Sequence, residues 1–391
     1  MSWASVALAD VCEINIGRTP ARAKKSYWAG GTHPWVSIAD MSRTEQIHDT
    51  KERITDIGVV ESGIRTVDPE TVLMSFKLSI GKVAIAKVPL FTNEAIAALP
   101  IRDRSILDPS YLFRALQNLD FQDSGNRAVM GRTLNKQSVS KLEIPLPPLD
   151  EQRRIAAILD KADELRRKRK RAIELLDGLT QSIFLDMFGD PIENPRKLPT
   201  RRLIDLVDAA RGISYGIVQR GDDQNVGVKV LRILDFQSGE VDGSDLKMTT
   251  PEIAGKYRRT ILEGGELVIS IRGTVGRCAE IPCELRGANV SREVAVMPTV
   301  NKALNDFYLA LLRTDSAQRR LRQDVKGVAQ SGINLEDLRE LHIVQPSNED
   351  IASFQRSQSR IADLKRSARL CLLQSEAVFS SLQHRAFSGQ L

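Results

Sequence analysis

Basic and amide side chains recur in the glycine-containing loops of this 391-residue sequence. Lys and Arg can neutralise the phosphates of a nucleic acid, and Arg, Gln and Asn can also read base edges in the major groove of DNA. Any one of them could be an ordinary surface residue, so their recurrence at matching places in two halves of the chain is what favours a function. The residues that we predict to bind double-stranded DNA are, in the first half, Arg18, Thr19, Lys24, Lys25, Lys77, Lys82, Arg132 and Asn135, and, in the second half, Tyr215, Gln219, Arg220, Arg232, Arg272, Thr274, Arg277, Arg292 and Asn334.

Common catalytic patterns are missing from the sequence. It contains no GxxxxGK[ST] phosphate-binding loop, no GxGxxG or HExxH, and neither Asn-Pro-Pro-aromatic nor Asp-Pro-Pro-aromatic, the motifs of base-flipping amino-methyltransferases. The four histidines are isolated from one another. Cys278 and Cys283 have no His or second Cys pair nearby, so we interpret the four cysteines as reduced structural thiols and predict no metal site. These absences favour a protein that binds over one that catalyses.

Length and composition set the frame for these loops. A chain of 391 residues is expected to form two domains, and a hydrophobic content of 42% is enough for two cores. The net charge of +6 suits a polyanionic partner, although many proteins reach it without binding nucleic acid. We expect a cytoplasmic protein, because the first residues lack the features of a signal peptide and no apolar run is long enough to span a membrane.

Internal repetition organises the whole chain. "LADV" with Gly17 reappears as "LIDL" with Gly212, after a shift of 195 residues. The same shift takes "SIAD" at 37–40 to "RILD" at 232–235, and "SFKLSIGK" at 75–82 to "SIRGTVGR" at 270–277. A shift of 199 takes "LNKQSVSKLEIPLP" to "INLEDLRELHIVQP". Several separated matches in nearly one register indicate a duplication, with loop insertions causing the drift.

Each half is predicted to fold in the same order. Short β-type runs separated by Gly, Pro, Asp and Asn come first, followed by a helical piece at 109–118 or 306–315. An apolar strand that ends in proline then leads directly into a long helix. The fold class expected from this order is α+β. We predict two pseudo-repeated mixed α/β domains, separated by two long helices that form an antiparallel coiled coil.

The long helices carry apolar residues in alternating steps of three and four, the pattern of a coiled-coil seam. A helix of about 38 residues would be about 57 Å long, so its narrow seam cannot be buried by one small domain. The alternative is two separate helices, each lying on its own domain. An antiparallel pair is favoured, because the linker at 189–200 is too short to return along a full helix with ease. The predicted seam consists of Ile155, Ile158, Ala162, Leu165, Leu176 and Leu179 in the first helix, and of Ile361, Leu364, Ala368, Val378 and Leu382 in the second.

Six consecutive basic residues, Arg166 to Arg171, interrupt the first helix. Six residues turn through about 600°, so this run occupies every face of the helix. Arg169 falls on the seam, where its stem can pack while its charged head reaches water. We interpret the run as a basic collar that could face DNA phosphates, an acidic surface of a partner, or only solvent.

The order "GRTP", "PWVSIAD", "TVLMSFKLSIGKVAIA", "NEAIAALP" and "IPLPPLDEQRRIA" closely resembles the specificity (S) subunit of type I restriction–modification systems. The last segment, Ile144–Ala156, is the most specific, and "GISYGIVQRG" in the second half resembles a second type of target-recognition domain. The resemblance covers essentially the whole chain. The second half departs where "GRTP" becomes "GISY" and where "LPPLDEQ" becomes "QPSNEDI", which suggests that the two halves read different sequences.

The resemblance implies a division of labour. Residues 1–148 would form target-recognition domain 1, 149–188 the first spacer helix, 189–346 a linker with target-recognition domain 2, and 347–391 the second spacer helix. Each domain would read one half of a bipartite DNA site, while the helices set the spacing and dock two modification (methyltransferase) subunits. Those subunits, and not this chain, would bind S-adenosylmethionine, and separate restriction subunits would cleave DNA.

Two other classes of function remain open on sequence alone. One is a helical scaffold that binds only protein partners, which predicts no affinity for DNA even with modification subunits present. The other is a stand-alone DNA methyltransferase or nuclease, which the missing motifs disfavour.

Overall fold

A computed structural model describes residues 3–119, 134–237, 239–323 and 332–391, and these fall into two compact units. Unit 1 consists of Met1–Arg169 and Cys371–Leu391, and unit 2 of Lys170–Leu370. Each unit therefore contains one globular part and one portion of each long helix, α7 (Leu149–Phe188) and α12 (Asn348–Phe387). Among the described helices, none combines the length and the apolar composition that crossing a bilayer requires.

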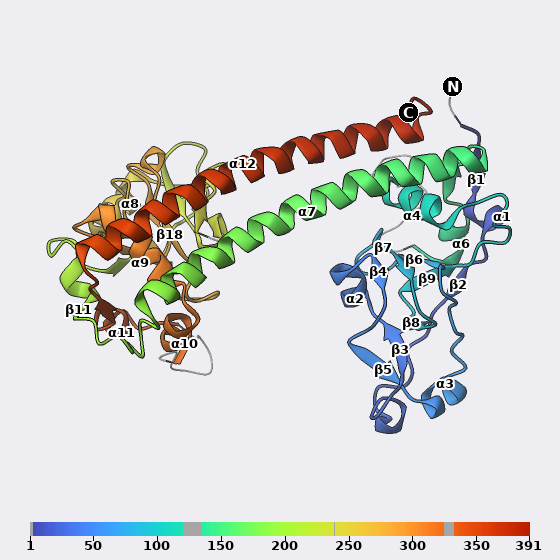
Figure 1. Ribbon diagram of the computed structural model, residues 1–391, viewed down its shortest axis with the longest axis horizontal. Helices are drawn as coiled ribbons and strands as arrows, with labels where there is room; N and C mark the ends of the chain where they lie inside the picture. The colour runs from blue at the N-terminus through green and yellow to red at the C-terminus, as the bar shows by residue number, and fades with distance from the viewer. Residues whose placement is uncertain (1–2, 120–133, 238, 324–331) are drawn as a thin grey trace. The chain divides into compact units, whose positions relative to one another are not determined.

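Unit 1 is built around a five-stranded sheet that is buried on both faces. Alternate residues of its central strands point to opposite sides, so Val72 and Met74 join one apolar cluster while Leu73 joins another. A three-stranded sheet adjoins it, and a short antiparallel pair lies next to α7 (Figure 1). The strand orders are β2 (Asn15–Ile16), β9 (Ile96–Leu99), β6 (Val72–Ser75), β7 (Val83–Ala86) and β4 (Gln46–Ile47); β5 (Glu52–Ile54), β3 (His33–Val36) and β8 (Phe91–Thr92); and β1 (Ser5–Ala7) with β10 (Glu143–Pro145). The helices are α1 (Leu8–Val11), α2 (Ile38–Arg43), α3 (Asp56–Ser62), α4 (Pro109–Gln117) and α6 (Lys136–Ser140).

Unit 2 repeats the strand order of these sheets, except that its main sheet has four strands in the described residues, without an equivalent of the edge strand β4, and that a further two-stranded pair is present. Its own apolar clusters share no residue with those of unit 1. The strand orders are β12 (Ser214–Tyr215), β20 (Val294–Met297), β17 (Leu267–Ser270) and β18 (Cys278–Glu280); β16 (Lys247–Thr249), β13 (Val228–Leu231) and β19 (Asn289–Val290); β11 (Thr200–Arg202) with β21 (His342–Val344); and β14 (Phe236–Gln237) with β15 (Glu240–Val241). The helices include α8 (Pro251–Gly255), α9 (Asn305–Leu312), α10 (Asp315–Gln323), α11 (Leu335–Arg339) and the 3-10 turns η3 (Ile233–Asp235) and η4 (Arg258–Thr260).

Side-chain hydrogen bonds confirm the duplication position by position. The Ser75 hydroxyl donates to the carbonyl of Ser79 and accepts from the Lys82 amide at 3.0 Å. The Ser270 hydroxyl makes the same pair of bonds, to the carbonyl of Thr274 at 2.5 Å and from the Arg277 amide at 2.9 Å. The matching sequence segments 75–82 and 270–277 therefore fold into equivalent turns, each held by the same two hydrogen bonds of a serine hydroxyl.

The pairing of Gly17 with Gly212 is wrong, because the structural counterpart of Gly17 is Gly216. A Cβ added to Gly17 would lie 2.2 Å from the carbonyl oxygen of Thr92, and one added to Gly216 would lie 1.8 Å from that of Val290. At both places the chain crosses so closely over the neighbouring strand that only glycine fits. The second half holds four extra residues before this crossing, which sequence matching at a fixed shift could not locate.

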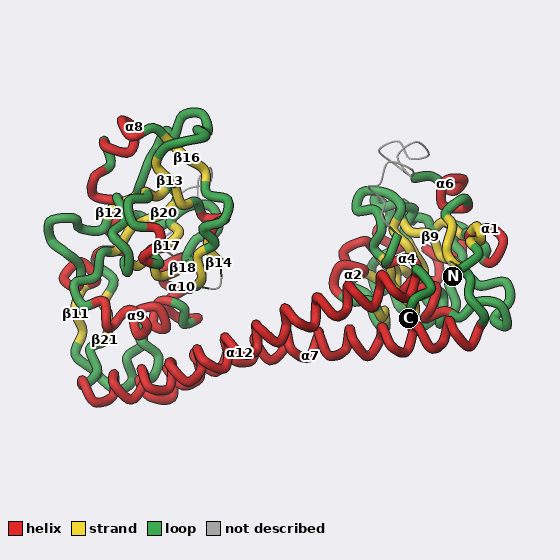
Figure 2. Tube along the Cα trace, turned by 90° about the horizontal axis from the view of Figure 1, so that it is seen from above, coloured by secondary structure: helices red, strands yellow, loops and turns green. Residues whose placement is uncertain are grey.

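In each unit α7 and α12 lie side by side and run antiparallel (Figure 2). In unit 1, Arg154 donates to the carbonyl of Leu391 and Arg169 donates to the Ser375 hydroxyl. In unit 2, Lys365 pairs with Asp177 at 2.6 Å, and the Thr180 hydroxyl bonds to Gln358 at 3.1 Å. Rising numbers in one helix meet falling numbers in the other, which confirms the predicted direction and rules out helices that lie apart on separate domains.

The predicted seam is only half correct in phase. Ile155, Ala162, Leu176, Ile361, Ala368 and Leu382 are buried or half-buried and Ile158 is half-buried, whereas Leu165, Leu179, Leu364 and Val378 are 47%, 43%, 57% and 54% exposed. Every second predicted seam position, such as Leu165 and Leu179, is therefore displaced, and the residue that lies in the seam comes one position later in the chain. These later positions hold Leu159, Arg166, Ile173 and Thr180 in α7, and Gln358, Lys365, Leu372 and Phe379 in α12. Hydrophobicity alone could not find this phase, because polar side chains occupy half of those positions.

A buried ion-pair network fixes the globular part of unit 1 to its helices. Arg114 of α4 is 3% exposed and bonds to Asp160 at 2.8 Å and to Asp163 at 3.3 Å, both on α7. The Asp163 side chain is 1% exposed, and Arg166 donates to it at 2.6 Å. Since a buried carboxylate is costly without its partners, this network specifies how α4 meets α7.

Replacing Arg114 with Met is expected to lower the free energy of unfolding by about 3 kcal/mol, because the change keeps a long side chain but leaves Asp163 short of a buried partner. Urea unfolding followed by circular dichroism measures the loss. Lys161→Met serves as the control, since Lys161 is 79% exposed and its ion pair with Glu164 is accessible to water. Equal unfolding midpoints for the two variants would contradict a stabilising role of the network.

The four cysteines of the chain are free thiols, and two of them are buried. Burial raises the pKa of Cys12 and of Cys278 to about 12, which leaves on the order of one thiolate in ten thousand at pH 8. Cys283 is exposed. A thiol-specific reagent at pH 8 is therefore expected to modify Cys283 in the folded protein and to reach Cys12 and Cys278 only after unfolding. Mass spectrometry of the labelled peptides tests this order, and Cys283→Ser should remove the early reaction at residue 283, while any early labelling of the partly exposed Cys371 is expected to persist.

Candidate nucleic-acid interface

The predicted residues of the first loop in unit 1 are engaged with their own domain to different degrees. Arg18 donates to the carbonyl of Ser62 at 2.6 Å, and the Thr19 hydroxyl bonds to Glu94. Lys24 bonds to Tyr27 at 2.8 Å and to Glu61 at 3.1 Å; hydrogen bonding to the Tyr27 hydroxyl, followed by Glu61, raises the pKa of Lys24. Lys25 is exposed, and its side chain has no bonded partner among the described residues. This loop is thus held in shape by its own polar groups.

The paired basic residues at the Ser75 and Ser270 turns divide into two kinds. Lys82 bonds to the Ser42 hydroxyl, and Arg277 donates to the carbonyl of Ile233 at 3.3 Å, so both reach back to equivalent helical turns, α2 and η3. Lys77 lies over the ring of Phe76, with its Nζ 5.4 Å from the centroid. Arg272 and Thr274 are exposed. Lys82 and Arg277 therefore hold their turns against the neighbouring helical turns, while Lys77 and Arg272 are available to a ligand.

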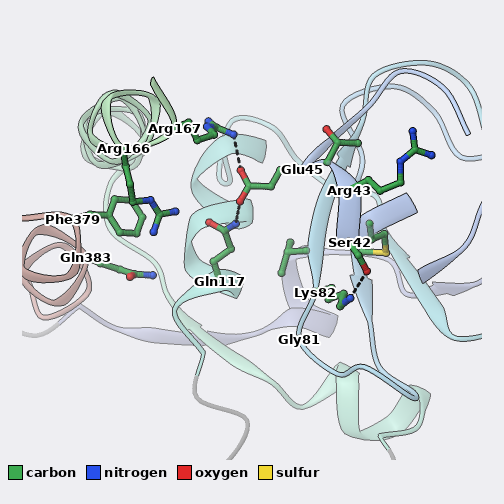
Figure 3. Close-up of a pocket in the computed structure, with 13 residues that line it drawn as sticks. Ser42, Arg43, Glu45, Gly81, Lys82, Gln117, Arg166, Arg167, Phe379 and Gln383 are labelled. Atoms are coloured by element: carbon green, nitrogen blue, oxygen red, sulfur yellow. Dashed lines mark hydrogen bonds and ion pairs between the residues drawn. The ribbon is translucent and has the colours of Figure 1, made fainter. Parts of the chain in front are cut away.

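A groove opens where Lys82 meets the helix pair of unit 1 (Figure 3). It has a volume of about 700 Å³ and is lined by Arg43, Lys82, Arg166 and Arg167 together with Glu45. Glu45 forms an ion pair with Arg167 at 3.0 Å and accepts a hydrogen bond from the Gln117 side-chain amide at 2.9 Å. The groove is therefore basic on balance, and its two sides come from the sheet edge and from the basic collar.

The structure gives most of the collar an architectural role. Arg166 pairs with Asp163 and lies 4.6 Å from the ring centroid of Phe379. Lys168 pairs with Glu164 at 2.6 Å, and Arg171 pairs with Glu174 at 3.2 Å. Arg169 bonds across the helix pair to the carbonyl of Cys371 and the hydroxyl of Ser375. The collar thus joins the helices to each other and to the domain.

Several residues predicted to contact DNA also have structural roles within their own domain. Asn135 and Asn334 are helix N-caps, accepting from the amides of Ser138 at 2.8 Å and Glu336 at 3.2 Å. Arg232 forms a fork with Asp235 at 2.9 and 2.6 Å, and this bonding raises the pKa of Arg232. Asparagine before a short helix signals a cap as readily as a base contact, so sequence alone did not separate the two roles.

The remaining predicted residues differ in accessibility. Arg220 pairs with Asp223 at 3.0 Å, and Arg292 lies 3.3 Å from Glu293. Tyr215 is 43% exposed and Gln219 is also exposed. Arg132 lies outside the described residues. Reasoning from sequence missed six cations that line two hollows beside β2 and β12, namely Arg65, Lys136, Lys256, Arg258, Arg259 and Arg339. Their signal was weak, because they are spread over four segments of the chain.

One catalytic pattern is present in letters only. Gly212–Gly216 reads GISYG, which matches the GxSxG of serine hydrolases. Ser214 lies in strand β12, not at a strand-to-helix turn, and its hydroxyl donates to the carbonyl of Arg211 at 3.4 Å. Within the described ranges, no three His, Cys, Asp or Glu side chains gather closely enough to hold a metal ion. The chemistry offered by this surface is the binding of anions and polar edges.

Comparison with known proteins agrees with this picture. A family model described as "Type I restriction modification DNA specificity domain" matches residues 1–175 and again residues 199–365. The type I restriction enzyme EcoBI specificity subunit of Escherichia coli is 23% identical over 356 residues, which are 83% of this chain and 74% of that protein. The MjaIX specificity subunit of Methanocaldococcus jannaschii is 29% identical over 197 residues, 49% of this chain and 45% of that protein.

Solved structures share the fold. A chain from a study of complex assembly and conformational transition in the type I R-M system has a TM-score of 0.56 at 18% identity, over 100% of this chain and 98% of that one. The S subunit of a type I restriction–modification system from M. genitalium has a TM-score of 0.52 at 15% identity, over 98% and 96%. At these identities the likeness shows that the architecture is shared.

Proposed function

The chain belongs to the type I restriction modification DNA specificity domain family, and we propose that it is the subunit that selects the DNA sequence on which a type I restriction–modification complex acts. Each globular part would read one half of a bipartite site. The observation that carries this proposal is one fold present twice with different exposed side chains. The turn that presents Lys77 in unit 1 presents Arg272 and Thr274 in unit 2, and in both units the serine hydroxyl bonds to the backbone of this turn in the same way.

The helix pair would set the gap between the half-sites and dock the modification subunits. Apolar side chains left outside the seam support docking, because exposed leucines on a paired helix are suited to cover by another protein. In unit 1 they are Leu165, Leu373 and Val378, and in unit 2 Leu175, Leu179, Leu364 and Leu370, each at least 43% exposed. Exposed apolar side chains on the helices of both units are in keeping with two modification subunits.

Catalysis would lie in the partners. In this proposal the chain binds no cofactor, S-adenosylmethionine is held by the modification subunits, and cleavage is carried out by restriction subunits. The described surface offers cations, amides and caps, and it is this binding chemistry that supports a non-catalytic role. Action on chromosomal and invading DNA places the protein in the cytoplasm.

The test is to map methylated adenines in DNA from cells that express this chain with its modification subunit. We expect one split sequence to be methylated, and methylation to vanish when the chain is omitted. Methylation that persists without the chain would refute the proposal.

Two outcomes would revive the other functions. A scaffold that binds only proteins would leave the purified complex without affinity for DNA. A stand-alone methyltransferase or nuclease would modify or cut DNA when the chain alone is supplied with S-adenosylmethionine and magnesium.

A further inference from the structure

Two hollows occupy the same place in the two repeats. The hollow of unit 1 lies between β2, the segment that follows α3, and α6, which are labelled in Figure 1. The hollow of unit 2 lies between β12, the segment that follows α8, and α11. Their volumes are about 310 and 540 Å³. Because a hollow lies at the same place in both copies of the fold, its position is determined by the fold that the two units share.

Hydrogen bonds establish that these segments are equivalent. Thr55 caps α3 by accepting from Gly58, and Thr250 caps α8 by accepting from Ile253. The segments after α3 and α8 end in matching backbone contacts, at Val67 with Leu90 and at Leu262 with Ala288. The helices α6 and α11 are the two that asparagine caps. Every wall of one hollow thus has a counterpart in the other.

The described residues that line the two hollows include several cations and no carboxylate. The unit 1 hollow contains Arg18, Arg65 and Lys136, with Asn15 beside them. The unit 2 hollow contains Lys256, Arg258, Arg259 and Arg339, with Tyr215 and Tyr257. The groove at Lys82 includes Glu45, and a further cavity at the α11 end of unit 2 includes Asp337 and Glu340. Among the described residues, the two equivalent hollows therefore offer positive charge without a carboxylate in their lining.

Most of these cations are free to bind an anion. Arg65, Lys136, Lys256, Arg258 and Arg259 are exposed, and their side chains form no hydrogen bond or ion pair with another described residue. Arg18 and Arg339 are held in place, by the carbonyl of Ser62 at 2.6 Å and by the carbonyl of Ile213 at 3.0 Å. Arg339 also pairs at 3.1 Å with Glu336, which is 64% exposed at the rim. Each hollow thus combines an anchored guanidinium with exposed cations that have no partner among the described residues.

The backbone beside each hollow packs closely against a neighbouring strand. Gly17 follows β2 and Gly216 follows β12, and both cross within van der Waals contact of the next strand. The residues after them, Arg18 and Ile217, donate to the carbonyls of Thr92 and Val290 at 2.8 Å. A closely packed backbone beside exposed cations suits a ligand whose negative charge recurs at regular spacing, as it does along a nucleic-acid strand.

We propose that each hollow holds a backbone phosphate of duplex DNA next to the half-site that its unit reads. This inference rests on the proposed function and adds the surface through which each unit is positioned. Phosphate contacts fix the register of a protein on the duplex, whereas base contacts carry the sequence information. Equivalent hollows at equivalent places would give both units the same orientation on the DNA, although their side chains differ.

The test is the double variant Arg65→Gln/Lys136→Gln in the complex with its modification subunit. Removing two of the cations that hold this phosphate is expected to weaken binding to DNA by about 10- to 100-fold near physiological salt, and to reduce the slope of log affinity against log salt by about one. The methylated sequence should stay unchanged. Arg258→Gln/Arg259→Gln is expected to act in the same way through unit 2.

The control is Lys51→Gln/Arg104→Gln, which removes two exposed cations of unit 1 from outside the hollow. Circular dichroism and copurification with the modification subunit verify folding and assembly of each variant. If the hollow variants match the control in affinity and slope, the inference is overturned. A changed methylated half-site with an unchanged slope would also overturn it, since that is the behaviour of base-reading residues. Failure of the unmutated complex to bind DNA would instead sink the proposed function.

Discussion

Exchanging residues 1–148 for the matching segment of another family member is expected to change one half of the methylated sequence and leave the other half intact. Unit 1 closes its own apolar clusters, and none of their residues takes part in the clusters of unit 2. A new first domain can therefore fold without altering the residues that unit 2 presents to DNA. Methylation mapping of DNA from cells that carry the chimera measures which side changes.

The helices impose one condition on that exchange. Ile155, Ala156 and Leu159 of α7 and Phe379 and Ala386 of α12 complete the first core, so an incoming domain must accept them. A donor with arginine at the position of Arg114 keeps the buried network as well. Donors that lack either feature are expected to give insoluble chains, and they report on packing instead of recognition.

The reciprocal exchange, of residues 200–346, supplies the matched comparison. It should alter the opposite half of the site and keep the half that the first exchange changed. If either chimera altered both halves, the units would not be reading DNA independently.

The sequence predicted the large-scale organisation well for a physical reason. Duplicated segments, proline-terminated strands and heptad stripes are long patterns whose errors average out, so the repeat and the antiparallel direction of the helices were recovered. The direction followed from a linker too short to return along a helix, which is an argument from length alone.

Local chemistry was harder to predict, because one residue type serves several purposes. Asn135 looks like a base reader and acts as a cap, and Arg232 looks exposed and forms a fork with Asp235. The seam was displaced by one residue at alternate positions, since Arg166 and Lys365 occupy places where a hydrophobic pattern seeks leucine. The hollows escaped notice because only the fold brings Arg65 near Lys136.

Adding one heptad to each long helix is expected to lengthen the gap between the half-sites by about three base pairs while both half-sites are kept. Seven residues extend a helix by about 10 Å, and duplex DNA rises about 3.4 Å per base pair. Duplicating residues 170–176 of α7 and 367–373 of α12 places the new turns between the contact of Arg169 with Ser375 and that of Asp177 with Lys365. Four-residue insertions in both helices should add about 6 Å, close to two base pairs.

The heptad insertion isolates length from packing. A multiple of seven preserves the alternation of seam positions, whereas four residues shift the stripe by about 40° and strain the pairing. The control replaces residues 170–176 with another seam-compatible heptad and adds nothing, so its gap should stay the same. The gap between the half-sites is read from the positions of the methylated adenines. If this gap grows with helix length and stays constant in the control, the helices set the spacing. A constant gap in a complex that still assembles would assign the spacing to the docked modification subunits, because their footprint on DNA does not depend on how long these helices are.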